Sequence, residues 1–380
     1  MAKGKKPAAP AKPEAAGGVS LTRGLYKAIK ATKHEFHATQ VAERLALTDK
    51  DRVEALSESI STYIVKNLPK AIERRDGLED YRTNPYVLLT SASVMRLTDA
   101  DTFANFLFNN KLYMGLETSF GKSIESVLVI PYPTGITSPA KWEDPPEKVA
   151  ESKALVGLDK EERAAKRIDS VWREIDKSIV VDTRRFLVSI KSGPNCINDT
   201  QVTGMTTAIV QQYPKWMAST KTNCPGVTEL DVIIGLTYGT DRTTNNKENQ
   251  ILIKLLQQGF EEEDRANKPG VLIDTATRSV RVYRRIGIDF WSMIGNPIQP
   301  QNYRFVYLEV LLALAKALAK GMTAASLEDR VNGKIRQLSQ ALANLSFPRN
   351  SLPAWVREEF KDHELTWLAA AMTAFYDSGV

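Results

Sequence analysis

The sequence predicts an α/β (α+β) protein in which a central mixed β-sheet is flanked by helices, with helical regions towards both ends of the chain. The spacing of apolar residues is helical in the first and last parts of the chain and strand-like only in the middle. Four runs rich in β-branched residues predict strands at 178–182, 185–191, 230–236 and 278–284. Helical patterns lie between them at 199–213 and 247–263. Strands that alternate with helices in this way are typical of a sheet covered by helices.

Changes in composition predict four consecutive segments. Residues 1–18 are mostly Ala, Pro, Lys and Gly without periodicity, which is typical of a disordered basic tail. Residues 19–112 carry apolar residues at helical spacing and predict a helical N-terminal subdomain. Residues 113–300 hold the predicted strands and form the core, and residues 301–380 predict a helical C-terminal region.

The composition restricts the kind of metal chemistry that the chain can support. Its 380 residues are 43% hydrophobic and 25% charged, as in a globular protein with a large core. There are two cysteines, Cys196 and Cys224, and three histidines, too few for a zinc cluster. A catalytic metal must therefore be held by oxygen ligands, which favours magnesium.

Charge and hydropathy bear on partners and compartment. The net charge of +6 and the pI near 9.0 are compatible with a polyanionic partner, although about half of the excess lies in the tail. The longest apolar run, Val310–Ala315, is far too short to span a membrane. The lysines near the N-terminus are not followed by an apolar core, so they do not form a secretory signal. We expect a cytoplasmic protein without a membrane partner.

Two side chains in the predicted hairpin point to phosphodiester hydrolysis. Asp176 stands at the start of the first strand and Lys191 at the end of the second. Alternation along the second strand places Ser189 and Lys191 on one face. A carboxylate at this position can hold a metal that neutralises a scissile phosphate and lowers the pKa of a bound water. The lysine can orient that water or stabilise the negative charge that develops.

This pattern resembles the PD-(D/E)XK nuclease superfamily, and the ending Ile-Lys-Ser-Gly-Pro-Asn resembles a set of its type II restriction endonucleases. Asp176 corresponds to the first acid and Lys191 to the lysine, but Ser189 stands where the superfamily has its second acid. The resemblance implies a mixed sheet of the restriction-endonuclease type and a homodimer that cuts double-stranded DNA with Mg²⁺, for which Mn²⁺ can substitute. It also implies a prokaryotic cytoplasm, with association with the nucleoid when the enzyme is bound to DNA.

Some restriction enzymes with Ser-x-Lys take the missing carboxylate from a helix, and Glu125 is the candidate here. Phe120, Ile124 and Val127 predict a helix with an apolar face, and Glu125 lies at the edge of that face. Gly121 and Glu125 fit the Gly-x-x-x-Glu helix of similar restriction enzymes. The resemblance thus implies Asp176 and Glu125 as metal ligands. A solvated helix glutamate is the alternative.

Other acids and one further motif compete with this assignment. Asp182 falls at the predicted hairpin turn, Glu174 would share a face with Asp176 if the strand began early, and Asp199 is expected to cap the next helix. Residues 115–123 nearly match a phosphate-binding loop, but the glycine spacing is wrong and no clear strand precedes them. We therefore expect no nucleotide cofactor.

Polar and basic side chains after the strands are candidate DNA contacts, because amide and guanidinium groups bond phosphates and base edges. The candidates are Asn195, Asn198, Gln201, Arg242, Asn245, Lys247 and Arg284. The first three can equally satisfy a tight turn, and Arg242, Asn245 and Lys247 can belong to an ordinary surface loop. Arg284 is part of a basic run with Arg281 and Arg285.

Three functions remain open at this point. The first is a type II restriction endonuclease, part of a restriction–modification system. The second is a repair or junction nuclease of the same superfamily. The third is a non-catalytic DNA-binding protein with a decayed nuclease core, which Ser189 motivates.

Overall fold

The computed structural model describes most of the chain and divides it into two compact units. The described ranges are 38–73, 77–127, 141–193, 196–263, 270–321, 324–345, 347 and 352–375, so the predicted tail lies outside them. One unit, here called the sheet unit, comprises Met1–Leu47 and Pro131–Tyr307. The other, the helical unit, comprises Thr48–Ile130 and Leu308–Val380.

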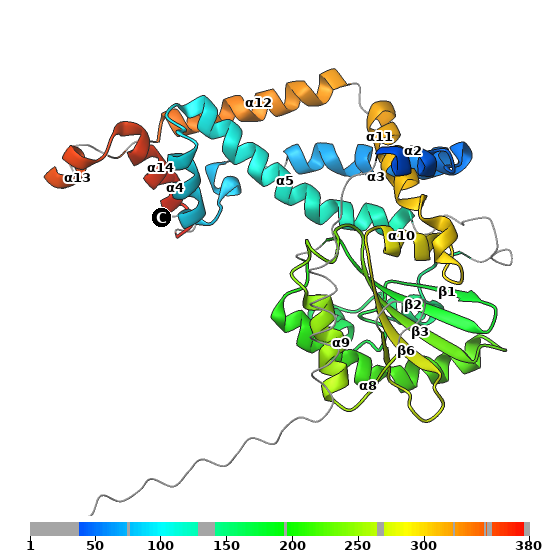
Figure 1. Cartoon of the computed structure of the whole chain (residues 1–380). Helices are drawn as coiled ribbons and strands as arrows, with labels where there is room; N and C mark the ends of the chain where they lie inside the picture. The colour runs from blue at the N-terminus through cyan, green and yellow to red at the C-terminus, as the bar shows by residue number, and fades with distance from the viewer. Residues whose placement is uncertain are drawn as a thin grey trace, which may run out of the picture. The chain divides into compact units, whose positions relative to one another are not determined.

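The sheet unit is built on a six-stranded mixed sheet with the strand order β1-β2-β3-β6-β5-β4. Figure 1 labels β1, β2, β3 and β6 of this sheet. Strands β2, β3 and β6 run parallel, and the remaining neighbours are antiparallel. The strands are β1 Lys177–Val181, β2 Arg184–Lys191, β3 Glu229–Leu236, β4 Glu261–Glu262, β5 Gly270–Leu272 and β6 Val280–Ile286. The predicted α/β architecture with a central mixed sheet is confirmed.

The central strands are nearly continuous runs of buried residues, as expected where helices cover both faces of a sheet. The turn between β1 and β2 falls at Asp182 and Thr183, one residue earlier than predicted. Asp182 has φ +53°, a left-handed conformation that aspartate tolerates better than most residues. Strands β4 and β5 were not predicted, because two or three residues are too few to show a period.

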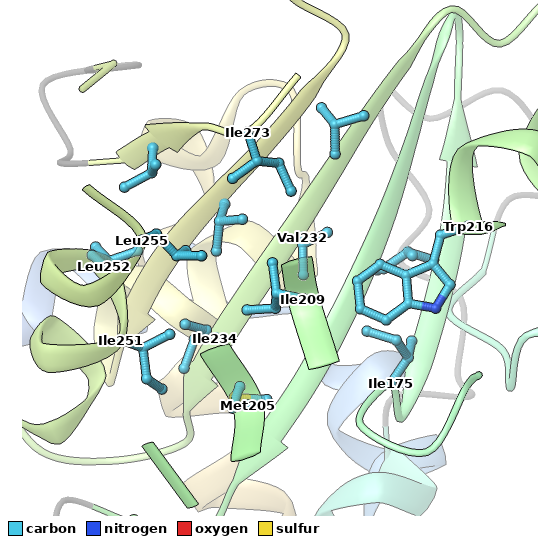
Figure 2. Close-up of a cluster of buried hydrophobic side chains, with 14 of the residues drawn as sticks. Ile175, Met205, Ile209, Trp216, Val232, Ile234, Ile251, Leu252, Leu255 and Ile273 are labelled. Carbon is cyan, nitrogen blue, oxygen red and sulfur yellow. The ribbon is translucent and has the colours of Figure 1, made fainter. Parts of the chain in front are cut away.

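Helices α8 (Asp199–Asn223) and α9 (Lys247–Gln257) cover one face of the sheet. Figure 2 shows their apolar side chains against those of β3. This core includes Met205, Ile209 and Trp216 from α8, Ile251, Leu252 and Leu255 from α9, and Val232 and Ile234 from β3. Helix α8 continues through Pro214, so it is longer than the predicted helix ending at 213.

Helix α10 (Ile288–Gly295) lies against the opposite face of the sheet, because its contact residue on β3 is Gly235, which alternates with Val232 and Ile234. A Cβ atom at Gly235 would lie 2.5 Å from the ring of Phe290, so glycine is required for this close packing. Trp291 Nε1 donates to the carbonyl of Thr237 at 2.8 Å. Phe290 and Trp291 are both buried.

Helix α6 (Pro146–Ala154) is joined to the sheet by a buried ion pair, and α7 (Lys160–Ile168) follows it. Arg185 on β2 donates to both carboxylate oxygens of Glu147, at 3.0 and 2.9 Å. Ser219 and Asn223 on α8 donate to the same carboxylate at 2.7 and 3.0 Å. Burial alone raises the pKa of Glu147, but the bonds from Arg185, Ser219 and Asn223 outweigh it and lower the pKa to about 2.

Glu147→Gln is expected to destabilise the sheet unit by about 3 kcal/mol at neutral pH, because it leaves the buried Arg185 without its counter-charge. The folded pKa lies below the ordinary value of 4.5, so the contribution of Glu147 is fully present above pH 4.5 and is lost as the pH falls towards 2. Urea denaturation followed by tryptophan fluorescence at several pH values measures both effects. Glu162→Gln, at an exposed position of α7, is the control and should change stability by less than about 0.5 kcal/mol. A wild-type-like stability of Glu147→Gln across this range would contradict the expectation.

The helical unit has its own apolar core, drawn from helices early and late in the chain. The indole of Trp367 donates to the carbonyl of Leu97 at 2.7 Å, and Arg52 forms an ion pair with Glu309 at 2.8 Å. The described helices whose bounds have not yet been given, α2 and η2 of the sheet unit included, are α2 Ala38–Leu45, α3 Lys50–Glu73, η1 Leu78–Tyr81, α4 Pro85–Val94, α5 Ala100–Val127, η2 Pro300–Tyr303, α11 Val306–Gly321, α12 Ala324–Ala343, α13 Ala354–Glu359 and α14 Asp362–Met372. No helix in the described ranges is both long and apolar enough to cross a membrane.

Candidate active site

Asp176 and Lys191 come together at one end of the β1–β2 hairpin. The amide of Asp176, one residue before β1, donates to the carbonyl of Val188 at 2.7 Å. Its Oδ2 accepts from the amide of Ile190, also at 2.7 Å. The antiparallel register pairs residue 177 with residue 188, so its continuation places Asp176 opposite Ser189. Asp176, Ser189 and Lys191 therefore share one face and one end of the sheet.

Ser189 and Lys191 offer polar groups that the fold does not use. Ser189 is completely buried, and within the described residues its Oγ has no hydrogen-bond partner. Lys191 is partly buried and ends β2, where its carbonyl accepts from the amide of Thr237 at 3.0 Å. In the described part of the chain its ammonium group has no ion-pair partner. The ammonium group of Lys191 is therefore available to a ligand, whereas the Ser189 hydroxyl is a buried polar group beneath the same face.

Lys148 on α6 is a further member of the site that the sequence analysis did not identify. Its Nζ donates to the carbonyl of Ile175 at 2.5 Å and lies 3.7 Å from Asp176 Oδ1. The two side chains are 30% and 24% exposed, so the contact is partly shielded from solvent. No local pattern distinguishes Lys148 from the other lysines of 141–166, because only the packing of α6 brings it to Asp176.

Glu125 lies near the end of α5, so the expected helix is present. Its side chain is outside the described residues, and α5 belongs to the helical unit. Its position as a second carboxylate therefore stays a prediction. Within the described residues, no group of three or more His, Cys, Asp or Glu side chains could hold a metal ion. Residues 115–123 lie within α5, which is not the loop that a phosphate-binding motif requires.

The competing acids lie elsewhere. Asp182 is exposed in the turn at the other end of the hairpin from Asp176. Glu174 precedes β1, which begins only at Lys177, and its carboxylate is 3.6 Å from Arg173. Asp199 is the first residue of α8 rather than its cap, because the preceding residue takes that role. The expected capping by Asp199 is therefore wrong by one position.

The predicted DNA contacts near α8 have structural partners. Asn198 and Gln201 form a capping box: the side chain of each accepts from the backbone amide of the other, both at 2.9 Å. The tight-turn alternative thus describes what these two side chains do in the free protein. Asn195 lies outside the described residues.

The loop between β3 and α9 is tied to the start of α8. Asn245 Nδ2 donates to the carbonyl of Ile197 at 2.8 Å, and Lys247 pairs with Asp199. Arg242 is exposed on this loop. These contacts hold the loop beside the residues that follow Lys191, so a DNA-binding role for Arg242 stays a prediction with a favourable location.

The basic run on β6 is largely engaged inside the sheet unit, because β6 is an interior strand. Arg284 is 7% exposed and pairs with Asp241. Arg281 bonds two carboxylates on neighbouring segments, those of Glu229 and Glu263, at 3.0 and 2.9 Å. Burial lowers the pKa of Arg285, whose guanidinium stacks on a tyrosine of its own strand. A DNA contact by Arg284 stays a prediction.

The hairpin that carries Asp176, Ser189 and Lys191 lies inside a segment with a recognised family. Residues 161–269 match the family model described as type II restriction endonuclease EcoO109I. This segment is thus similar to the core of a restriction-endonuclease-like nuclease. The match confirms the resemblance stated from the sequence and supports a nuclease function in general. No curated protein matches the chain.

Proposed function

We propose that the chain is a type II restriction endonuclease that makes sequence-specific double-strand cuts in DNA. The observation that carries the proposal is the convergence of Asp176 and Lys191 on one face and one end of the sheet, inside the segment that matches the restriction-endonuclease family. A carboxylate beside an uncommitted ammonium group suits phosphodiester hydrolysis.

The residues at this end of the sheet fit a divalent metal with oxygen ligands, and enzymes of this family generally use one. Asp176 and Glu125 are the proposed ligands of Mg²⁺, for which Mn²⁺ can substitute. The buried and unpaired Ser189 Oγ offers a neutral oxygen on the same face. When bound, the ion supplies neutralisation of the scissile phosphate and lowers the pKa of a water molecule. Lys191 donates hydrogen bonds to the phosphate oxygens, on which negative charge develops.

Double-strand cutting requires two active sites, so we propose that the enzyme binds duplex DNA as a homodimer. Its two-fold symmetry would match a palindromic or nearly palindromic site. Arg242 on the loop after β3 is exposed and is one of the proposed base or phosphate contacts. The prokaryotic cytoplasm, close to the nucleoid, is the compartment in which such an enzyme meets its DNA.

Digestion of a large phage DNA with Mg²⁺, followed by sequencing of the fragment ends, tests the function. The expected result is a set of discrete fragments whose ends share one sequence, and no cleavage after chelation of the metal. Nicking that follows DNA structure rather than sequence would favour a repair or junction nuclease. Binding without any cleavage would favour a decayed nuclease. The observation that suggests this alternative is Ser189, which stands where the superfamily has its second acid.

A further inference from the structure

A pocket lies between α6, α7 and the segment before β1, next to the candidate active site. Its volume is about 610 Å³, and all of its lining residues belong to the sheet unit. The charged residues that line it are Lys148, Lys166, Arg167, Arg173, Glu151 and Asp169. Four basic groups against two acidic ones make the pocket positive.

The basic groups of the pocket are available to a ligand. Lys166 and Arg167 are exposed in the last turn of α7, and in the described part of the chain neither side chain has an ion-pair partner. Arg173 is 56% exposed at its side chain, and its Nε lies 3.6 Å from Glu174 Oε1, a surface ion pair that an anionic ligand has to compete with. One of the two acids, Glu151, accepts a hydrogen bond from Ser170. An anion is therefore the ligand class that the pocket suits.

Lys148 connects the pocket to the catalytic carboxylate. It lines the pocket, and its Nζ lies 3.7 Å from Asp176 Oδ1. Along one DNA strand the phosphates follow at about 3.4 Å of helix axis each. A strand with its scissile phosphate at Asp176 and Lys191 that runs towards α6 would bring a neighbouring phosphate to Lys148 and the pocket.

We propose that this pocket binds a backbone phosphate of the cleaved strand, next to the scissile one. The proposal rests on the proposed nuclease function and adds a positioning site to it. Lys148 stands between the pocket and Asp176 and contributes positive charge to both. Lys166, Arg167 and Arg173 hold the neighbouring phosphate and so fix which phosphodiester bond lies at the active site.

The double variant Lys166→Gln/Arg167→Gln tests the pocket, with Lys153→Gln/Lys160→Gln as its control. Each double variant removes two exposed positive charges. Lys166 and Arg167 belong to α7, Lys153 to α6 and Lys160 to the start of α7, but Lys153 and Lys160 do not line the pocket. Affinity for duplex DNA is measured over a salt series without divalent metal. The slope of log K against log salt should fall by about 0.9 in the pocket variant for each phosphate that the protein no longer neutralises, and by clearly less in the control.

A second measurement locates the bound phosphate on the DNA. Single methylphosphonates, which lack the negative charge, are placed at each phosphate around the mapped cut in a duplex. A methylphosphonate adjacent to the scissile phosphate should weaken DNA binding by the wild-type protein. The same methylphosphonate should not weaken DNA binding by Lys166→Gln/Arg167→Gln, which has already lost the contact. Equal salt slopes for the pocket and control variants, or identical methylphosphonate profiles for the pocket variant and the wild type, would overturn the pocket. A wild-type protein that binds no duplex DNA would overturn the proposed function itself.

Discussion

Replacement of Lys191 by methionine is expected to reduce the single-turnover rate of DNA cleavage by about 10²- to 10³-fold, the usual loss when one charge-stabilising donor is removed from a transition state. Lys191 shares its sheet face and end with Asp176. In the described part of the chain its ammonium group has no ion-pair partner, so its charge is not used by the fold. Methionine preserves the apolar stem and removes only the charge.

The rate is measured with enzyme in excess over a duplex that carries the mapped cut site. Lys221→Met, at an exposed position near the end of α8, removes the same charge away from the site and serves as the control. DNA affinity without metal should change only a few-fold in both variants, which separates an effect on chemistry from an effect on binding. A cleavage rate for Lys191→Met within threefold of the wild type would remove Lys191 from the active site.

Asp176→Asn is expected to lower cleavage by at least about 10³-fold, which corresponds to about 4 kcal/mol of transition-state stabilisation. It should also weaken metal binding. Asp176 uses Oδ2 to accept from the amide of Ile190 at 2.7 Å, and the side-chain oxygen of asparagine can keep that bond. The hairpin should therefore stay folded while the negative charge is removed, so thermal unfolding should be close to that of the wild type.

Calorimetric titration with Mn²⁺ measures the metal effect without relying on activity. Asp182→Asn is the matched control, because it makes the same change at the turn, where asparagine tolerates φ +53°. Glu125→Gln should weaken Mn²⁺ binding as Asp176→Asn does if Glu125 supplies the second carboxylate. Unchanged Mn²⁺ affinity in Asp176→Asn would remove Asp176 as a ligand, and unchanged affinity in Glu125→Gln alone would require a different second acid.

The sheet and the pair of residues at its end could be predicted because both follow from local patterns. Runs rich in β-branched residues predicted β1, β2, β3 and β6 within one or two residues of their observed bounds. Once the hairpin was placed, the spacing of Asp176, Ser189 and Lys191 determined their common face. The mixed character of the sheet also followed, because a helix separates β2 from β3.

The contribution of Lys148 could not be predicted, because it depends on where α6 packs and α6 carries several equivalent charges. The state of the arginines on β6 was also hidden, since a sequence does not show which strands are interior. Arg281 and Arg284 are both 7% exposed because β6 lies between β3 and β5. The cap of α8 at Asn198 was missed in favour of Asp199, because both residue types favour that position.

The helical unit is made of two stretches of chain, Thr48–Ile130 and Leu308–Val380, with most of the sheet unit between them. The bond from Trp367 to the carbonyl of Leu97 joins the two stretches. During synthesis the first stretch leaves the ribosome well before the second stretch is made. The apolar residues of the first stretch therefore cannot pack against those of the second until synthesis is nearly finished. Folding of the sheet unit in the meantime shortens the loop that must close between them. A chain that stops before α12 would lack the apolar residues that α12 and α14 contribute to the core of the helical unit.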